Sequence, residues 1–388
     1  GGRVLVPFGS QKRVGIVVDL PASSDVAKEK LKPIIDVLDA DSLFNSTTWD
    51  WLSWSANYYR AALGDVLFQA LPVKLRNGES AVKNDRTFWR ITDLGKQALE
   101  SGELKRAKKQ IEALNLLLTQ DLEKGNNEIS SAIWSALKGK DYVEEIIVPT
   151  EQKSWQQALG DNPVVNLDNR LTLNKQQALA FSQLLFQEGF NVWLLEGVTG
   201  SGKTEIYLQY IEEVLKKGKQ VLVLVPEIGL TPQTVRRFQA RFNVEIDVLH
   251  SNLNDSQRLN VWERARTGQS AIVIGTRSAL FTQFSDLGLI ILDEEHDASY
   301  KQESPPRYLT SQVARKRGAY HQCPVVLGSA TPSLESYSRA LKGAYELCIL
   351  SQRVNQKPLP QIELIDMVEE MKAHHYEVLS RKMKAKIQ

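Results

Sequence analysis

One stretch of the sequence combines glycines, a lysine and a threonine at the spacing that proteins use to bind phosphate. Gly197-Val198-Thr199-Gly200-Ser201-Gly202-Lys203-Thr204 has the form G-x-x-x-x-G-K-T. Such glycines let successive backbone N–H groups turn inward and form an anion site at a helix N-terminus. Lys203 is expected to bind the β- and γ-phosphates of a nucleotide, and the Thr204 hydroxyl to bind Mg²⁺. We therefore predict a P-loop whose nucleotide-binding residues are Gly197, Thr199, Gly200, Ser201, Gly202, Lys203 and Thr204.

A second group of reactive side chains is acidic and follows an apolar run. Asp293 and Glu294 come directly after Ile290-Ile291-Leu292, about ninety residues beyond the P-loop. Asp293 is expected to hold Mg²⁺ through water, and Glu294 to orient and deprotonate an attacking water. An acid-rich helix N-terminus is the alternative. The P-loop upstream favours a Walker B motif, with Lys203, Asp293 and Glu294 as catalytic residues.

Two hydroxyl side chains follow the next apolar run, in Gly328-Ser329-Ala330-Thr331. Ser329 and Thr331 could connect the acidic motif to another part of the molecule. His296 is open to two interpretations: a buried histidine with its hydrogen bonds satisfied, or a link from the acidic motif to these hydroxyls that senses the nucleotide.

The motifs lie in a region where apolar runs alternate with helical patterns, from about residue 171 onwards. Near-continuous β-branched runs of this kind predict a parallel sheet covered by helices on both faces. Ligands bind such sheets at the carboxyl ends of the strands, where nearly every motif falls. The predicted strands are 192–196, 221–225, 245–249, 271–274, 289–292, 325–327 and 345–350.

The first eighty residues have a different pattern. Residues 3–8 and 14–20 are β-patterned on either side of a polar turn, which predicts a hairpin. A helix is predicted near 47–63, capped by Thr47 with Asp50 in the reciprocal position. Its aromatic residues share one face, which we interpret as core packing in preference to a base-stacking platform; they are Trp51, Trp54 and Tyr58.

Residues 86–150 form a second small unit by pattern. Helical patterns at 104–119 and 128–138 precede a strand-like run at 142–148, which suggests a winged-helix-like module. A charged run there could meet phosphates, although a solvated helix face is preferred; it comprises Lys105, Arg106, Lys108 and Lys109. Residues 151–170 are polar and irregular, and are predicted to be a linker.

Composition narrows the class of protein. The 388 residues are 42% hydrophobic and 24% charged, with a formal net charge of +2, which by itself does not indicate nucleic-acid binding. No apolar run is long enough to span a membrane and no signal-peptide pattern is present, so a cytoplasmic location is expected. Two cysteines, Cys323 and Cys348, supply neither a disulfide framework nor a zinc-ligand set. Because the chain starts with Gly1-Gly2 and ends in a basic helical stretch, we expect it to be part of a longer protein.

The order of the motifs resembles that of superfamily 2 helicases over about 171–365. The series is 173–177, the P-loop, 225–231, 275–279, Asp-Glu-Glu-His and Gly-Ser-Ala-Thr. The individual residues within and around these motifs resemble those of the PriA family of bacterial replication-restart helicases. The segments that carry this likeness are 226–233, 275–281 and 293–302 in the lobe, and 6–9 and 64–72 before it.

The resemblance implies roles for further residues. Gln177 would recognise adenine. Gln177 and His296 are both expected to be nucleotide-binding residues. The loops at 226–233 and 275–279 would hold one DNA strand by its phosphates; their DNA-binding residues would be Pro226, Glu227, Thr231, Thr276, Arg277 and Ser278. An aromatic-rich loop would stack bases, with an ordinary surface loop as the alternative; its residues are Tyr300, Lys301, Arg307 and Tyr308. Gly9 would lie in a pocket for a 3′-terminal nucleotide, unless the hairpin turn alone requires it.

The resemblance also implies fold and function. The expected fold is a RecA-like P-loop lobe (171–366), preceded by an incomplete 3′-end DNA-binding domain (1–80) and the 86–150 module, and followed by a connection (367–388) to a second lobe. The expected activity is ATP- and Mg²⁺-dependent 3′→5′ unwinding at abandoned forks. Zinc belongs to a region of the family that has no ligands in this chain. Expected partners are forked DNA with a 3′ end, single-stranded DNA-binding protein and other primosome proteins, in the bacterial cytoplasm near the nucleoid.

Two departures from the family limit these expectations. The strand before the hairpin is absent, and so is a second lobe with its arginine finger, so this chain alone is expected to bind ATP and DNA but hydrolyse ATP poorly. Two rival functions remain open. One is another superfamily 2 translocase or an RNA helicase, and the other is a non-catalytic scaffold that binds forks and senses nucleotide.

Overall fold

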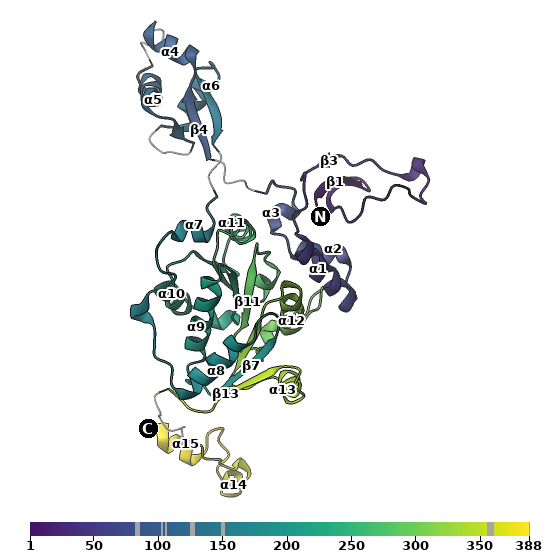
Figure 1. Ribbon diagram of the computed structural model, residues 1–388, viewed down its shortest axis with the longest axis vertical. Helices are drawn as coiled ribbons and strands as arrows, with labels where there is room; N and C mark the ends of the chain where they lie inside the picture. Colours follow the sequence, from purple (N-terminus) through teal and green to yellow (C-terminus); the bar gives the residue numbers. More distant parts are fainter. Residues whose placement is uncertain are drawn as a thin grey trace.

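The computed structural model describes residues 1–81, 86–101, 104, 107–124, 129–148, 152–354 and 361–387. Figure 1 shows a central α/β lobe, a small unit that stands apart above it, and the N-terminal elements beside it. The last helices, α14 (Met367–Lys372) and α15 (Arg381–Ile387), lie at the opposite end from the small unit. Within the described residues, no helix is both long and apolar enough to cross a bilayer.

The lobe is organised around one sheet of seven parallel strands in the order β13-β7-β12-β11-β8-β10-β9. Each predicted apolar run corresponds to one strand, so the predicted fold class is confirmed. The strands are β7 (Val192–Gly197), β8 (Gln220–Leu224), β9 (Ile246–Leu249), β10 (Ile272–Gly275), β11 (Leu287–Leu292), β12 (Val325–Ser329) and β13 (Glu346–Leu350).

Alternating strand residues enter two separate cores, which is why the runs are apolar throughout. Leu194 packs into one core and its neighbours Trp193 and Leu195 into the other. The Trp193 side is covered by α7 (Trp155–Leu159), α8 (Lys175–Phe186), α9 (Lys203–Lys216) and α10 (Pro232–Arg241). The opposite side is covered by α11 (Asp255–Arg266), α12 (Thr310–His321) and α13 (Leu334–Leu341).

The N-terminal hairpin is present as predicted. Strand β1 (Arg3–Phe8) pairs antiparallel with β2 (Gln11–Ile16) and with the short β3 (Asp36–Val37). Three helices follow, α1 (Ser46–Tyr58), α2 (Leu63–Gln69) and α3 (Val73–Arg76). The predicted cap is wrong: the side chain of Asn45, not Thr47, accepts from the backbone N–H of Thr48 at 2.8 Å.

The aromatic face of α1 is divided between core and surface. Trp51 is fully buried, as core packing predicts, whereas Trp54 is only partly buried and Tyr58 is 55% exposed. The rings of Trp54 and Tyr58 stack on each other with their centroids 4.7 Å apart. The core interpretation therefore holds for Trp51 but not for the whole stripe.

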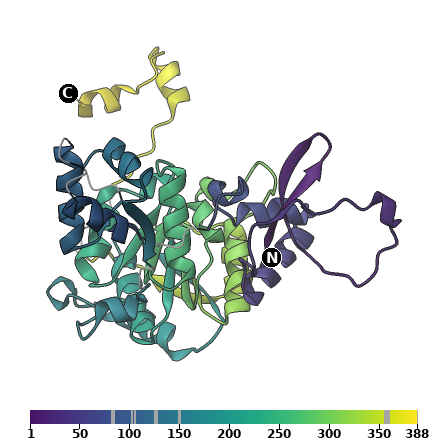
Figure 2. The same ribbon diagram turned by 90° about the horizontal axis from the view of Figure 1, so that it is seen from above.

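These N-terminal helices share a core with the lobe. The ring of Trp51 lies 5.6 Å from that of Phe281, and the indole N–H of Trp262 donates to the carbonyl of Ala70 at 3.0 Å. Gln283 donates to the carbonyl of Leu43 at 3.1 Å. Figure 2 shows the same helices lying against the lobe while the β1–β2 hairpin projects outward.

The small unit has its own sheet and core. Strand β4 (Arg86–Ile91) lies between β5 (Leu122–Glu123) and β6 (Val143–Val148), all antiparallel, with α4 (Asp93–Glu100), α5 (Lys108–Thr119) and α6 (Ser131–Lys138) against them. Trp89 and Trp134 stack at its centre, 5.4 Å apart. Lys108 and Lys109 are exposed, while Lys105 and Arg106 lie outside the described residues. In the segment expected to be a linker, α7 packs onto the lobe through Trp155, which is 2% exposed.

Candidate nucleotide and nucleic-acid site

The P-loop connects the end of β7 to the start of α9, so Lys203 is the first residue of that helix. Its ammonium group donates to the carbonyl of Gly197 at 2.9 Å and lies 3.9 Å from Glu294 Oε1. The lysine and the acidic motif, 90 residues apart in sequence, therefore meet at the carboxyl edge of the sheet. This is the arrangement that a triphosphate between them requires.

Asp293 follows β11 and is held in place by a tyrosine that the sequence analysis missed. The hydroxyl of Tyr207, on α9, donates to Asp293 Oδ1 at 3.1 Å. Burial raises the pKa of Asp293, and the neighbouring Glu294 carboxylate adds to this. Tyr207 lies one turn beyond Thr204 on the same helix, so α9 supplies both a ligand candidate and the group that orients another.

Gly328 leaves the space that this tyrosine occupies. A Cβ on Gly328 would lie 1.5 Å from the Tyr207 hydroxyl and 3.4 Å from Asp293 Oδ1. Any larger residue at position 328 would therefore displace the Tyr207 hydroxyl from the Asp293 carboxylate. This close approach is a physical reason for glycine at the start of Gly-Ser-Ala-Thr.

The oxygen-bearing side chains that would serve a magnesium ion line one cavity of about 770 Å³. Thr204, Asp293 and Glu294 face it together with Tyr207. Among the residues that the structure describes, no group of three or more His, Cys, Asp or Glu side chains is arranged to hold a metal ion. Mg²⁺ is commonly bound by one or two protein oxygens plus phosphates and water, so this sparse oxygen set fits it.

Gln177 braces the P-loop. It forms a capping box with Asn174 at the start of α8, and its Nε2 donates to the carbonyl of Ser201 at 2.9 Å. Both ends of its amide thus bind protein groups in this structure. Recognition of adenine by Gln177 stays a prediction; its contact with the P-loop is a second role that the sequence did not reveal.

The acidic motif contacts the hydroxyl motif through its last two residues. His296 Nδ1 lies 2.7 Å from Ser329 Oγ, and Ser329 Oγ also accepts from the backbone N–H of Thr331 at 3.0 Å. This hydrogen bond is the contact that the linking interpretation of His296 requires, and the exposed ring does not fit the interpretation as a buried histidine. Sensing of the nucleotide by His296 stays a prediction. Glu295, to which the sequence assigned no role, accepts from the Ser333 N–H at 2.7 Å and anchors the start of α13.

A groove of about 470 Å³ lies at the same edge of the sheet, beside the cavity of about 770 Å³. Of the predicted DNA-binding residues, Glu227, Thr231 and Thr276 line the groove, while Pro226 lines the 770 Å³ cavity instead. Ser278 lies elsewhere, in a smaller hollow beside Ala70. Sequence analysis missed the groove residues Arg236, His250, Ser251 and Asn252; the position of the last three directly after β9 was the available signal.

The predicted aromatic loop packs inward. Tyr300 is 1% and Tyr308 3% exposed, and the Tyr300 hydroxyl donates to the carbonyl of Asp293 at 2.8 Å. Neither ring offers a face to a base, so this structure contradicts the predicted stacking by these two tyrosines. Aromatic rings in a loop next to a sheet edge gain more from burial than from solvent exposure.

The charged members of the loop remain accessible. Lys301 and Arg307 are exposed and line a cavity of about 670 Å³. Arg277, expected to contact a phosphate, donates to the carbonyls of Ser299 at 2.8 Å and Lys301 at 2.6 Å. It thereby connects the predicted DNA-binding loop at 275–279 to the aromatic-rich loop.

Gly9 occupies the turn between β1 and β2. Its φ is +60°, a left-handed conformation that glycine adopts without strain. A Cβ there would meet nothing within 4 Å. The turn thus accounts for the glycine, and a role in binding a terminal nucleotide stays a prediction.

Comparison with known proteins identifies two parts of the chain. A family model described as DEAD/DEAH box helicase matches residues 174–340, and one described as 3′DNA-binding domain matches residues 1–72. The replication restart protein PriA of Haemophilus influenzae is 67% identical over 387 residues, which cover 96% of this chain and 53% of that protein. The PriA proteins of Bacillus subtilis and Synechocystis are 33% and 34% identical, covering 100% and 98% of this chain and 56% and 55% of theirs.

The seven-stranded lobe resembles the first lobe of DEAD/DEAH-box helicases in its fold and motif positions, and it contains the residues that match that family model. The similarity to PriA proteins extends beyond this lobe to nearly the whole chain. The chain belongs to the PriA family and spans about half the length of the curated relatives it matches.

Proposed function

We propose that the protein is an ATP-dependent 3′→5′ DNA helicase that recognises stalled or abandoned replication forks and initiates replication restart. The observation that supports this most directly is the shared edge of the sheet. Lys203, Asp293 and Glu294 meet there, and the groove lined by Thr231 and Thr276 opens beside them. ATP hydrolysis and DNA binding would therefore both take place at the carboxyl ends of the same β-strands.

Each residue has a part that follows from its position. The Lys203 ammonium neutralises the β- and γ-phosphates, and Glu294, 3.9 Å away, accepts the proton of the attacking water. Thr204 and Asp293 supply oxygens to a magnesium ion, which when bound offsets the charge developing on the phosphates. The groove holds a strand through its phosphates without reading sequence, because hydroxyl-bearing residues such as Thr231, Ser251 and Thr276 line it together with Arg236.

The substrate and partners follow from the family relationship. The match of residues 1–72 to a 3′DNA-binding domain supports recognition of forked DNA with a 3′ end, near Gly9. We propose domains at 1–80 and 171–366, with a winged-helix-like module at 86–150. Single-stranded DNA-binding protein and other primosome proteins are the proposed partners, in the cytoplasm beside the nucleoid. The 388 residues alone are proposed to bind ATP and DNA but to hydrolyse ATP slowly.

Phosphate release and nucleotide binding by the chain test the proposal. Forked DNA with a free 3′ end should stimulate release more than an RNA duplex of equal length does. Lys203→Ala should weaken binding of a fluorescent ATP analogue roughly 10- to 100-fold, because it removes a charge-assisted phosphate contact. Release stimulated equally by RNA would favour another superfamily 2 enzyme. Binding of nucleotide without any DNA-stimulated release, in a longer chain that includes the second lobe, would favour a sensing scaffold.

A further inference from the structure

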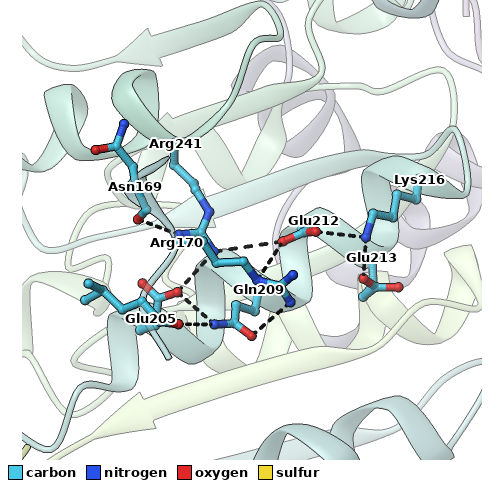
Figure 3. Close-up of polar contacts among 9 residues, drawn as sticks. Asn169, Arg170, Glu205, Gln209, Glu212, Glu213, Lys216 and Arg241 are labelled. Atoms are coloured by element: carbon cyan, nitrogen blue, oxygen red, sulfur yellow. Dashed lines mark hydrogen bonds and ion pairs between the residues drawn. The ribbon is translucent and has the colours of Figure 1, made fainter. Parts of the chain in front are cut away.

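A buried network of charged and amide side chains lies against the P-loop helix (Figure 3). Helix α9 presents Glu205, Gln209 and Glu212 at spacings of four and three residues, which places them on one face of the helix. Arg241, the last residue of α10, points into this face. Arg241, Glu205 and Glu212 are 1%, 6% and 1% exposed, so their charges are withdrawn from water.

The network joins three segments. Arg241 pairs with Glu205 Oε1 at 3.0 Å and donates to the carbonyl of Asn169 at 2.7 Å. Gln209 donates to Glu205 Oε1 and to the carbonyl of Leu171, both at 2.9 Å. Helix α9, helix α10 and the segment 169–171 are therefore fixed to one another by buried polar contacts.

Each of these segments leads directly to a part of the site. Glu205 follows Thr204 in the P-loop. Helix α10 begins at Pro232, after Thr231 of the groove. The segment 169–171 continues into the start of α8, where Gln177 contacts the P-loop at Ser201. Arg241, at the end of α10, contacts both of the other segments, through Glu205 and through the carbonyl of Asn169.

The network is incompletely bonded. Among the described residues, Arg241 Nε and Glu212 Oε2 have no hydrogen-bond partner. Glu212 Oε2 lies 3.9 Å from Arg241 Nη2 and 3.6 Å from Arg170 Nε, beyond hydrogen-bond range. Buried polar groups are rarely left unpaired. A displacement of about 1 Å would bring Arg241 and Glu212 into hydrogen-bond distance, so the guanidinium has a second arrangement close by.

We propose that Arg241 is a positioning residue that couples nucleotide occupancy of the P-loop to the strand-binding groove by redistributing its contacts between Glu205 and Glu212. This rests on the proposed function, since it assumes that both ligands bind. When phosphates engage the start of α9, the acids on its buried face shift relative to Arg241. Helix α10, and with it Thr231 at the groove, follows.

The test measures the dissociation constant of the 388-residue chain for a labelled single-stranded DNA oligonucleotide, with Mg-ADP and with a non-hydrolysable Mg-ATP analogue. Their ratio is the coupling factor, and linkage requires that saturating DNA change the preference for analogue over ADP by the same factor. The parent chain should give a factor of about five or more. Glu205→Gln and Arg241→Lys should bring it to within about twofold of one, with affinity for the analogue alone kept within about threefold.

Glu213→Gln is the matched control, because Glu213 is on the same helix but contacts Lys216 at 2.9 Å and not Arg241. It should retain the parent factor. An unchanged factor in both network variants, a parent factor of one, or an equal loss in Glu213→Gln would each overturn the proposal. If Arg241→Lys unfolds at a much lower temperature than the parent chain, the coupling factor of the isosteric Glu205→Gln variant tests the proposal. Loss of folding or of nucleotide affinity in both variants would overturn it and leave the network a structural role only. A parent chain that binds neither nucleotide contradicts the proposed function itself.

Discussion

Tyr207 illustrates what residue types and spacing can and cannot predict about a site. Lys203, Asp293 and Glu294 could be assigned from the sequence because each belongs to a motif whose spacing carries its chemistry. Tyr207 belongs to no motif, and its partner Asp293 lies 86 residues away in the chain. The sequence contains only an indirect sign of this tyrosine, which is the glycine at position 328. In the structure the Tyr207 hydroxyl occupies the space that a side chain at position 328 would need.

Removing that hydroxyl should weaken the magnesium site without unfolding the lobe. Tyr207→Phe leaves Asp293 free to rotate, and loss of a group that orients a metal ligand typically costs 10- to 100-fold in metal affinity. We expect the Mg²⁺ concentration for half-maximal binding of a fluorescent ATP analogue to rise by about tenfold. Tyr210→Phe, on the same helix but lining a different cavity, is the control. Equal Mg²⁺ requirements in the parent and in Tyr207→Phe would contradict the assignment.

His321 should make stability depend on pH. Burial, with the Arg317 guanidinium adding to it, lowers the pKa of His321 from 6.5 to about 3. The histidine is therefore neutral in the folded chain between these values but protonated after unfolding, so its contribution to stability falls as pH drops below 6.5. We expect the free energy of unfolding to lose roughly 1–3 kcal/mol from this residue between pH 6.5 and 4.5. His321→Gln should flatten that part of the pH profile; identical slopes for parent and variant would exclude the effect.

At the scale of elements, the seven strands followed from the sequence because each is a largely apolar run. The five inner strands, β7, β8, β10, β11 and β12, are buried on both faces, whereas β9 and β13 at the edges are partly exposed. The order of the strands did not follow from the sequence, since the pairing of β7 with β12 and β13 depends on contacts distant in sequence. The helix cap was wrong because Thr47 and Asn45 are both good caps, and only the backbone geometry distinguishes them. The prediction that the aromatic-rich loop stacks bases was wrong for a similar reason. The sequence shows that aromatic rings are present but not whether they point into the core or towards solvent.

The cap of α1 can be tested by paired substitutions. Asn45→Ala removes the acceptor of the Thr48 N–H and should cost about 1 kcal/mol of unfolding free energy. Thr47→Ala, at the position that the sequence favoured, should cost less than about 0.5 kcal/mol. Urea denaturation of both variants measures the difference. A larger loss for Thr47→Ala would restore the cap that the sequence predicted.

At the scale of the whole molecule, the N-terminal helices and the lobe share one hydrophobic core. The different sequence pattern of the first eighty residues did not reveal this contact, because packing between two apolar segments leaves no mark in the sequence. Arg317 shows how tightly they are joined: its guanidinium lies 5.1 Å from the centre of the Trp51 ring and donates to the carbonyl of Thr282 at 2.6 Å. The unit at 86–148, with its own core, has no share in this packing among the described core residues.

Substitution of Trp51 should therefore loosen the lobe as well as α1. Trp51→Ala leaves a cavity against Phe281 and Arg317, and truncation of a buried tryptophan typically costs 3–5 kcal/mol. Hydrogen exchange should accelerate in α1, in α12 and around Phe281 together, while β4–β6 keep the parent rates, because cooperative opening follows the shared core. Trp54→Ala, on the same helix but partly exposed, should accelerate exchange around Phe281 far less, because the Trp54 ring faces α12 at Lys316, whose ammonium lies 5.3 Å from the ring centre. Faster exchange confined to residues 43–75 in Trp51→Ala would show that the two parts unfold independently despite their shared core.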